Sequence, residues 1–305
     1  MSAIPYIGQD VVELITDSNH IEIVLPSLGT ISPSAIKNKI AKKELKKNSL
    51  KIPKGFLEAF VGFVDGDGYF SIGETDKGYI RIKLVINVSK DSSRRGESYS
   101  NSNLLKEFQE TLKMGSLLDY KSKDREYSRY IINKTDLQYI LIPLLRHQNL
   151  YFLTNNRRAQ YLKVLHILEG NILFYKDIPE IEVPQWGLKD YQKVEFLRNW
   201  LVGFTMAAGS FFIKGNKDAC YQISQMKHHN LLFAIKGLLN LDIHPTPGDY
   251  SHLRVSSIKD IQKVIDFFSF SGNWPIFGHK QQQYAIWIAS LRESTRYKHL
   301  RFPNI

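Results

Sequence analysis

The feature that most constrains this chain is a helix-like pattern that occurs twice. The first copy runs from Phe56 to Ile72 and the second from Phe196 to Ile213, and in both copies a glycine separates the apolar helix pattern from a strand-like run. A segment repeated at corresponding places in two similar halves indicates an internal duplication, so the chain should fold as two related units. The copies differ chemically, because Ala208 stands where the first copy has Asp67.

Each half has the same order of expected elements, αββαββαα, which predicts an α+β fold made of two pseudo-symmetric repeats. In the second half this order includes a strand near Ile243 to Thr246, before a strand near Leu253 to Ser256. A stretch with prolines and few periodic apolar residues separates the halves and reads as a linker. The predicted divisions are residues 1–54 as a leading segment, 55–175 as the first repeat, 176–190 as the linker, and 191–305 as the second repeat.

Composition narrows the classes of partner. The 305 residues are 43% hydrophobic, which suffices for a substantial core, and carry a formal charge of +11. Such basicity favours a polyanionic partner, most often nucleic acid, with an anionic membrane surface as the weaker alternative. No apolar run is long enough to span a bilayer, the first ten residues lack the pattern of a signal or transit peptide, and no import by a presequence is expected. The single cysteine, Cys220, is better explained as a small strand residue than as a nucleophile.

The leading segment ends in a lysine-rich run. Residues 36–54 contain eight lysines and one glutamate, and Pro53 closes the run. A solvated helix or flexible tether is the ordinary explanation of such a run, and a basic arm that binds nucleic acid is the alternative.

Small residues recur on one face of each signature helix. Gly62 and Gly66 are four residues apart in the first copy, and Gly203 and Ala207 repeat that spacing in the second. Because glycine destabilises a helix interior by about 0.5 to 1 kcal/mol relative to alanine, two of them on one face need a reason. Close packing of the two signature helices at the centre of the molecule would explain the small residues, because it needs backbones that approach closely. It would also bring the C-terminal ends of the two helices side by side.

The sequence Asp65-Gly-Asp67-Gly68 closes the first signature helix and permits two interpretations. Carboxylates at the ends of two adjacent helices can share divalent cations. The same tetrapeptide can simply end a helix, because glycine favours a C-cap and aspartate tolerates a turn. A calcium loop of the EF-hand type fits worse, since Tyr69 and Asp76 occupy positions where that loop needs other ligands.

Taken together, the duplicated motif and the element order resemble the LAGLIDADG homing endonucleases in their single-chain, two-repeat form. Phe60 to Gly68 corresponds to the first family motif and Leu201 to Gly209 to the second, and the resemblance extends from Phe56 to about Tyr297. It implies that the motif helices pack at the centre and that two antiparallel sheets form a saddle over a DNA major groove. It also implies a monomer that contains an internal pseudo-dimer.

A second resemblance concerns the start of the chain. The run from Ser2 to Glu13 is similar to a characteristic stretch of mitochondrial cytochrome b. It implies an exon remnant read in frame into a protein encoded by a group I intron, as in fungal mitochondrial relatives. The expected location is then the mitochondrial matrix, with the gene in the mitochondrial genome, and whether this segment is removed by proteolysis stays open.

The family resemblance also assigns the metal site. Each motif supplies one metal-binding carboxylate at its penultimate position, which here is Asp67 in the first repeat and Ala208 in the second. A methyl group cannot coordinate Mg²⁺, and Met206 offers only a soft thioether to this hard cation. The implied Mg²⁺ site is therefore weak or vestigial, and balanced cleavage of two DNA strands should be poor.

Basic and polar residues that match other family positions are retained. Arg157 and Lys280 occupy equivalent places and are each followed three residues later by glutamine. In the family such residues help to polarise water or the scissile phosphate, and Gln225 matches another polar site residue, whereas its equivalent Val88 does not. Ordinary phosphate-binding surface residues are an equally good explanation.

Two functions remain open from the sequence. The first is an RNA splicing maturase that binds its group I intron RNA and stabilises the splicing-competent fold, with a host-encoded splicing cofactor as a further possible partner. The second is a homing endonuclease that cleaves or nicks a double-stranded DNA target, which would be intronless cytochrome b DNA. Neither requires a membrane.

Overall fold

The computed structural model describes residues 49–89, 102–121, 126–226, 228–246, 248 and 250–304. These residues all belong to one compact unit of the chain. The segment that resembles cytochrome b and most of the lysine-rich run lie outside the described residues.

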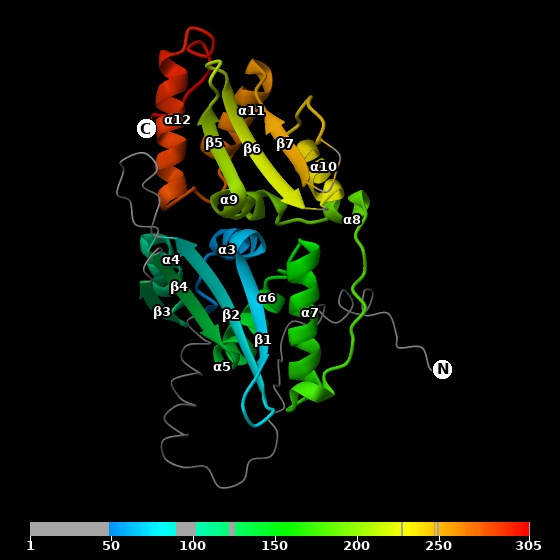
Figure 1. Ribbon diagram of the computed structural model, residues 1–305. Helices are drawn as coiled ribbons and strands as arrows, with labels where there is room; N and C mark the ends of the chain where they lie inside the picture. The colour runs from blue at the N-terminus through cyan, green and yellow to red at the C-terminus, as the bar shows by residue number, and fades with distance from the viewer. Residues whose placement is uncertain are drawn as a thin grey trace. The chain divides into compact units, whose positions relative to one another are not determined.

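The first repeat begins with the long motif helix α3 and continues into a four-stranded antiparallel sheet (Figure 1). Its strand order is β1-β2-β4-β3. The elements of this repeat are α3 Lys54–Asp67, β1 Gly68–Glu74, β2 Ile80–Ser89, α4 Ser102–Leu112, β3 Ser116–Lys121, β4 Glu126–Asn133, α5 Lys134–Asp136, the π-helical turn Leu137–Leu141, α6 Ile142–His147 and α7 Asn155–Glu169.

The second repeat follows the same order with a smaller sheet. After the 3₁₀ turn Tyr175–Asp177 and the short helix α8 Leu188–Gln192, the second motif helix leads into strands ordered β5-β6-β7. Its elements are α9 Leu197–Ala208, β5 Gly209–Ile213, β6 Ala219–Met226, α10 His229–Leu238, β7 Tyr250–Val255, α11 Ile258–Ser269 and α12 His279–Glu293. The predicted α+β fold with two antiparallel sheets is therefore confirmed.

One expected strand does not form as predicted. Within Ile243 to Thr246, only Thr246 is paired, in an isolated antiparallel bridge with His252. Pro245 and Pro247 flank Thr246 in the sequence, and neither can donate a backbone hydrogen bond to a neighbouring strand. The described part of the second sheet therefore has three strands.

Strand alternation separates an inner and an outer face in the first sheet. Ile80, Ile82, Leu84 and Ile86 on β2 are buried in the core, so the intervening residues project to the other face. We call this the outer face of the first sheet, and it carries Tyr69, Arg81, Lys83, Asn87, Leu118, Tyr120, Tyr127 and Arg129. The described helices pack on the opposite, inner face. On the outer face Arg81 is exposed and Lys83 is half-buried, whereas Val85 is buried.

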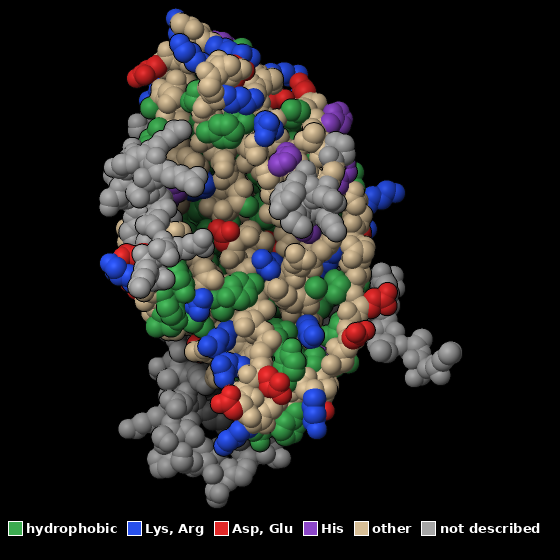
Figure 2. Space-filling view, viewed as in Figure 1, with side chains coloured by type: hydrophobic (Ala, Val, Ile, Leu, Met, Phe, Trp, Pro, Cys, Tyr) green, Lys and Arg blue, Asp and Glu red, His purple; other side chains and the backbone are tan. Residues whose placement is uncertain are grey.

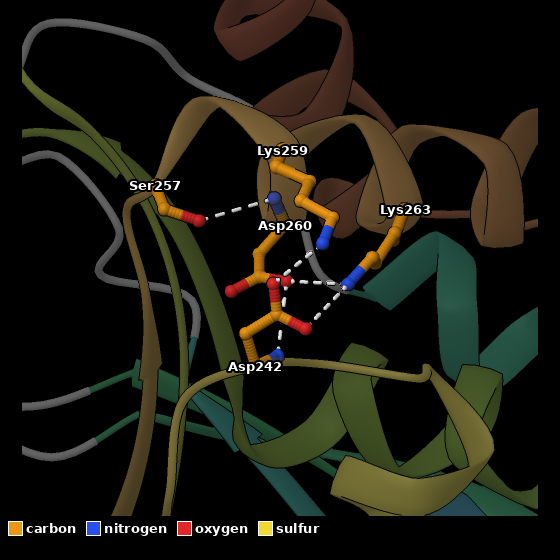
Figure 3. Close-up of polar contacts among 5 residues, drawn as sticks. All are labelled: Asp242, Ser257, Lys259, Asp260 and Lys263. Carbon is orange, nitrogen blue, oxygen red and sulfur yellow. Dashed lines mark hydrogen bonds and ion pairs between the residues drawn. The ribbon is translucent and has the colours of Figure 1, made fainter.

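A carboxylate pair fixes the start of α11 in the second repeat (Figure 3). Asp260 is buried, its backbone N–H donates to the Ser257 hydroxyl that caps the helix, and its carboxylate accepts from the backbone N–H of Asp242. Lys263 bridges both carboxylates, at 2.9 Å from Asp260 and 3.2 Å from Asp242. Because every carboxylate here has a local partner, the cluster ties the loop after α10 to α11 and serves a structural role.

No helix among the described residues is long and apolar enough to cross a lipid bilayer.

Candidate active site at the ends of the motif helices

The two motif helices cross at closest approach through the predicted small residues. A methyl group built at Gly62 would overlap the carbonyl oxygen of Trp200, and one built at Gly203 would overlap that of Ala59. A methyl group at Gly66 would overlap the Cβ atom of Ala207. Small residues at these positions therefore allow the backbones of α3 and α9 to touch, and this brings the C-terminal ends of the helices together.

Asp65 lies inside this seam and holds the fold together. Its side chain is 4% exposed, and its Oδ1 accepts hydrogen bonds from the backbone N–H and the hydroxyl of Thr154, at 3.0 and 2.6 Å. Its Oδ2 accepts from the backbone N–H of Leu153 at 2.8 Å and from Nε1 of Trp200 at 2.7 Å. Burial raises the pKa of Asp65 to about 6, although these hydrogen bonds favour the ionised form. With both oxygens occupied, Asp65 is not a metal ligand.

Asp67, the last residue of α3, is exposed at the end of the helix. Neighbouring protein atoms displace enough water to raise its pKa to about 6, and the positive charges of Lys280 and Arg157 act in the opposite direction. It borders a small pocket of about 140 Å³. The pocket is lined by Phe63, Asp67, Val88, Leu104, Met206, Ala207, Phe277, His279 and Lys280.

The equivalent end of α9 carries no acid. Ala208 is the last residue of that helix and is half-buried against the core. Met206, which replaces Asp65, is buried, and its sulfur accepts a weak hydrogen bond from the backbone N–H of Phe277 at 3.4 Å. The loop before α12 thus contacts α9 in the same way that the loop before α7 contacts α3, with a thioether in place of a carboxylate.

Two cations approach the site from the last helix of each half. On α12, Lys280 Nζ donates to the carbonyl of Gly209 at 2.6 Å and to Gln283 Oε1 at 2.9 Å, and burial lowers its pKa to about 8. On α7, Arg157 donates to the carbonyl of Val64 at 3.3 Å and to Gln160 Oε1 at 3.1 Å. Burial also lowers the pKa of Arg157, and Asp65 and Asp67 oppose that shift. The structure therefore brings Asp67, Arg157 and Lys280 into one electrostatic cluster.

The glutamines that follow these cations have a visible structural task. Gln160 Oε1 accepts from the backbone N–H of Phe70 at 3.0 Å, and Gln283 Oε1 accepts from that of Phe211 at 3.4 Å. Each glutamine thus joins the first strand of its repeat to the helix that carries the cation.

Gln225 is placed differently from the other sequence-predicted site residues. It is half-buried on β6, paired with Ser251 of β7. Among the described residues, no hydrogen bond joins its side chain to Asp67, Arg157 or Lys280. Its equivalent in the first repeat, Val88, lines the pocket beside Asp67.

The donors present do not match a two-carboxylate metal site. Within the described residues no group of three or more His, Cys, Asp or Glu side chains is arranged to hold a metal ion. Among the described residues that line the pocket at the helix ends, Asp67 is the one carboxylate; Asp65 is occupied by its hydrogen bonds, and Ala208 has no side-chain oxygen. A hard cation would obtain only one carboxylate from the motifs, so no chemical step can be assigned to such an ion here.

The sequence interpretation missed the polar contacts that cross the seam. Trp200 donates to Asp65, and Asn199 Nδ2 donates to Glu58 Oε2 at 2.7 Å. The available signal was that equivalent positions carry different residues, with Ala59 matching Trp200 and Glu58 matching Asn199. Different residues at equivalent positions indicate that the contacting faces of the two motif helices are complementary rather than identical.

Comparisons with known proteins agree with this architecture. Residues 60–168 match the model of the LAGLIDADG endonuclease family. The LAGLIDADG meganuclease I-CpaMI bound to uncleaved DNA has a similar structure, with a TM-score of 0.61 and 18% identity over 79% of this chain and 93% of that chain. I-SmaMI, solved with its uncleaved DNA target in the presence of calcium ions, has a TM-score of 0.56 and 20% identity over 77% of this chain and 90% of that chain. Residues 60–168 of the first repeat thus match the LAGLIDADG endonuclease family model, and the fold is similar to that of the LAGLIDADG meganucleases.

Sequence relatives add a cellular context. The chain is 29% identical to the mitochondrial protein RF1 of Saccharomyces cerevisiae, over 62% of this chain and 39% of that protein. It is 27% identical to the probable intron-encoded endonuclease Cox1-I1b of Schizosaccharomyces pombe, over 80% of this chain and 66% of that protein. The matches thus span less than two thirds of these two relatives. The resemblance to the intron-encoded LAGLIDADG family is confirmed, with relatives named as mitochondrial or intron-encoded proteins.

Proposed function

We propose that this protein is a mitochondrial group I intron maturase, which binds its cognate cytochrome b intron RNA and assists splicing on an endonuclease scaffold. In this role it stabilises the folded RNA, and the RNA supplies the splicing chemistry. The observation that carries the proposal is the asymmetry of the helix ends. Asp67 is exposed between two cations, whereas Ala208 offers a methyl group at the equivalent place.

This asymmetry shows that the packing of the two halves does not depend on the acids that cleavage requires. The close packing at Gly62 and Gly203 maintains the junction of the two halves, even though only one half retains its acid. Hydrolysis of both strands of a duplex needs stabilisation of charge at two phosphates, and one carboxylate serves at most one of them. Nucleic-acid binding has no such requirement, so it can persist after loss of cleavage.

The outer faces of both sheets suit a polyanion. In the first sheet, Arg81, Lys83 and Arg129 project outward, and the described outward positions of its four strands contain no carboxylate. Figure 2 shows Lys and Arg side chains interspersed with hydrophobic ones, and with some acidic ones, over this part of the molecule. Cations of this kind bind phosphates independently of sequence, and structured RNA is recognised largely through its phosphates and shape.

A polar chain crosses the outer face of the second sheet. Arg254 Nε donates to Gln222 Oε1 at 2.8 Å, Gln222 Nε2 donates to Ser224 Oγ at 2.8 Å, and Ser224 contacts His252 Nδ1 at 2.7 Å. Mutual hydrogen bonds hold these groups in place before a ligand arrives, which reduces the entropy lost on binding. The second sheet therefore presents a preorganised polar surface that suits a nucleic acid.

The proposed host and location rest on sequence. The similarity of Ser2 to Glu13 to cytochrome b supports an origin within a cytochrome b intron, and relatives named as mitochondrial or intron-encoded support the mitochondrial matrix. A host-encoded splicing cofactor remains part of the proposal.

The second candidate is a homing endonuclease reduced to nicking one strand of intronless cytochrome b DNA. Asp67, Arg157 and Lys280 remain clustered at one helix end, and this observation favours residual chemistry there. The structural relatives bound to DNA and a sequence relative named as an endonuclease support the same candidate. Any Mg²⁺ dependence would be weak, because the two motifs together supply only Asp67 as an available carboxylate.

One paired experiment separates the candidates. Purified protein is mixed with the cytochrome b intron RNA and, separately, with supercoiled intronless cytochrome b DNA, each in Mg²⁺ at physiological salt. The maturase proposal predicts faster splicing and DNA that stays uncut or is only slowly nicked. Efficient double-strand cleavage together with unchanged splicing would overturn it, and the Asp67→Asn variant reports any cleavage by a contaminating nuclease.

A further inference from the structure

Two aromatic rings lie exposed at the far end of the first sheet. Tyr79 begins the strand segment after the β1–β2 turn, and Phe174 lies in the segment that follows α7. The two residues form an isolated antiparallel bridge, and their rings stack with centroids 5.0 Å apart and an interplanar angle of 24°. Tyr79 is 46% exposed and Phe174 is 37% exposed. The stacked pair therefore presents aromatic surface to solvent.

The pair belongs to the outer face of the first sheet. Tyr79 precedes buried Ile80 and alternates with it, so its ring projects to the same face as Arg81 and Lys83. Three acids lie nearby: Glu74 pairs with Ile80, Asp76 is in the turn, and Asp177 follows Phe174 by three residues. A methyl group built at Gly78 would lie 3.6 Å from Glu74 Oε1 and 3.8 Å from Phe174 Cδ1, so the Glu74 carboxylate comes close to the ring pair. Tyr79 thus shares the outer face with Arg81 and Lys83, while the Glu74 carboxylate lies near Phe174.

The second repeat shows that the fold does not require these exposed rings. Its equivalent hairpin makes the same turn, because Lys214 N–H donates to the carbonyl of Asp218 as Thr75 N–H donates to that of Tyr79. Asp218 therefore occupies the place of Tyr79, and it pairs with Arg296. At the sequence offset of 123 that relates Arg157 to Lys280, Tyr297 corresponds to Phe174. Tyr297 is buried, and its hydroxyl accepts from the backbone N–H of Ala219 at 3.2 Å.

We propose that Tyr79 and Phe174 form a stacking platform for an unpaired base of an RNA ligand, with Arg81 and Lys83 holding the adjoining phosphates. This inference rests on the proposed function, and it names the kind of nucleotide that this part of the surface takes. An unpaired base has a free face for stacking, whereas the bases of duplex DNA present only their edges in the grooves. The platform therefore favours looped or single-stranded RNA over duplex DNA.

The test uses the full chain and two defined probes. The first is an oligoadenylate RNA of about twelve nucleotides carrying one 2-aminopurine, a length within the usual site size of single-strand binders. The second is a duplex DNA of similar length. Tyr79→Leu and Phe174→Leu keep apolar bulk but remove the ring, Tyr79→Trp keeps a ring, and Tyr139→Leu removes a ring that is 45% exposed elsewhere in the same repeat.

Each leucine variant at the platform should weaken binding of the RNA probe roughly ten- to a hundredfold, the usual loss for one base–aromatic stack. Tyr79→Trp and Tyr139→Leu should retain the wild-type affinity, and duplex DNA binding should change less than twofold in all variants. Equal RNA affinity in the leucine variants overturns the platform, as does an equal loss for both probes.

The outcome is distinguishable from failure of the maturase proposal. Wild-type acceleration of splicing combined with unchanged RNA affinity in the leucine variants rejects the platform alone. Conversely, ring-dependent stacking of the probe by a protein that does not act on the intron rejects the maturase role alone. Thermal unfolding of each variant, compared with Tyr139→Leu, separates loss of stacking from loss of folded protein.

Discussion

The ends of the two motif helices occupy equivalent places but have different chemistry. At the end of α3, Asp65 makes four hydrogen bonds and Asp67 lies between Arg157 and Lys280. At the end of α9, Met206 makes one weak contact and Ala208 makes no polar contact through its side chain. The helix backbones nevertheless meet through small residues contributed by both. Packing between the halves thus requires no acid at the end of α9, because the small residues of both helices make the close contact.

The largest expected effect comes from breaking the seam itself. Gly203→Ala places a methyl group where the carbonyl oxygen of Ala59 lies, so the helices must separate. We expect a loss of about 3 kcal/mol or more in the free energy of unfolding, the upper end for overpacking in a core. Gly237→Ala is the matched control, since no atom lies within 4 Å of a methyl group there, and it should stabilise α10 by about 0.5 to 1 kcal/mol. Denaturant titrations measure both, and equal stability of the two variants would contradict the packing argument.

The buried acid gives the next largest effect. Asp65→Asn places an amide N–H₂ group against at least one existing donor, either Trp200 Nε1 with Leu153 N–H or the Thr154 pair. Stability should fall by about 2 to 3 kcal/mol, as for loss of hydrogen bonds to a buried charged group. The corresponding change in the second repeat, Met206→Leu, should cost less than about 1.5 kcal/mol.

Trp200→Phe links these two predictions in a double-mutant cycle. Removing the indole N–H should make Asp65→Asn less harmful, because one of the conflicting donors is gone. Strict additivity of the two changes would show that the contact across the seam does not contribute to stability.

Restoring an acid at the second helix end tests how far that site has changed. Ala208→Glu should raise Mg²⁺-dependent cleavage of the DNA target on the order of tenfold, if Lys280 and Arg157 still support chemistry there. Ala208→Gln has a similar size without the charge and should not raise it. Quantifying nicked and linear plasmid gives the readout. If Ala208→Glu cleaves no faster than the wild type, the change in the second site involves more than one residue.

The smallest expected effect is on the pKa of Asp67 and on the pH dependence of stability. Asp67 should titrate near pH 6, and Lys280→Met should move its pKa further upward, because a nearby positive charge favours the carboxylate. Since the folded-state pKa lies above the ordinary value, the folded state holds the proton more tightly, and stability should rise slightly as pH falls from above 6 towards 4. Carboxyl ¹³C shifts measure the titration, with Asp67→Asn providing the assignment. A downward shift in Lys280→Met would contradict the proposed cluster.

Much of the architecture can be predicted from the amino-acid sequence. The duplicated motif and the repeated element order predicted two α+β repeats, and the two antiparallel sheets confirm that fold. The four-residue spacing of glycine and alanine indicated the helix contact, and the structure places those residues in it. The strand near Ile243 was overpredicted, because strand-like composition did not outweigh the prolines beside Thr246.

The sequence by itself determined the duplication, the basic charge and the absence of an acid at position 208, because these depend only on residue identity and spacing. Tertiary structure alone decided the separate tasks of the two aspartates. Two residues apart on a helix, they face different surroundings, so Trp200 and the Thr154 loop bury Asp65 while Asp67 remains at the surface between two cations. Lys280 lies 213 positions after Asp67 in the 305-residue chain, and long-range packing brings the two charges close together. The sequence around either residue does not predict that contact.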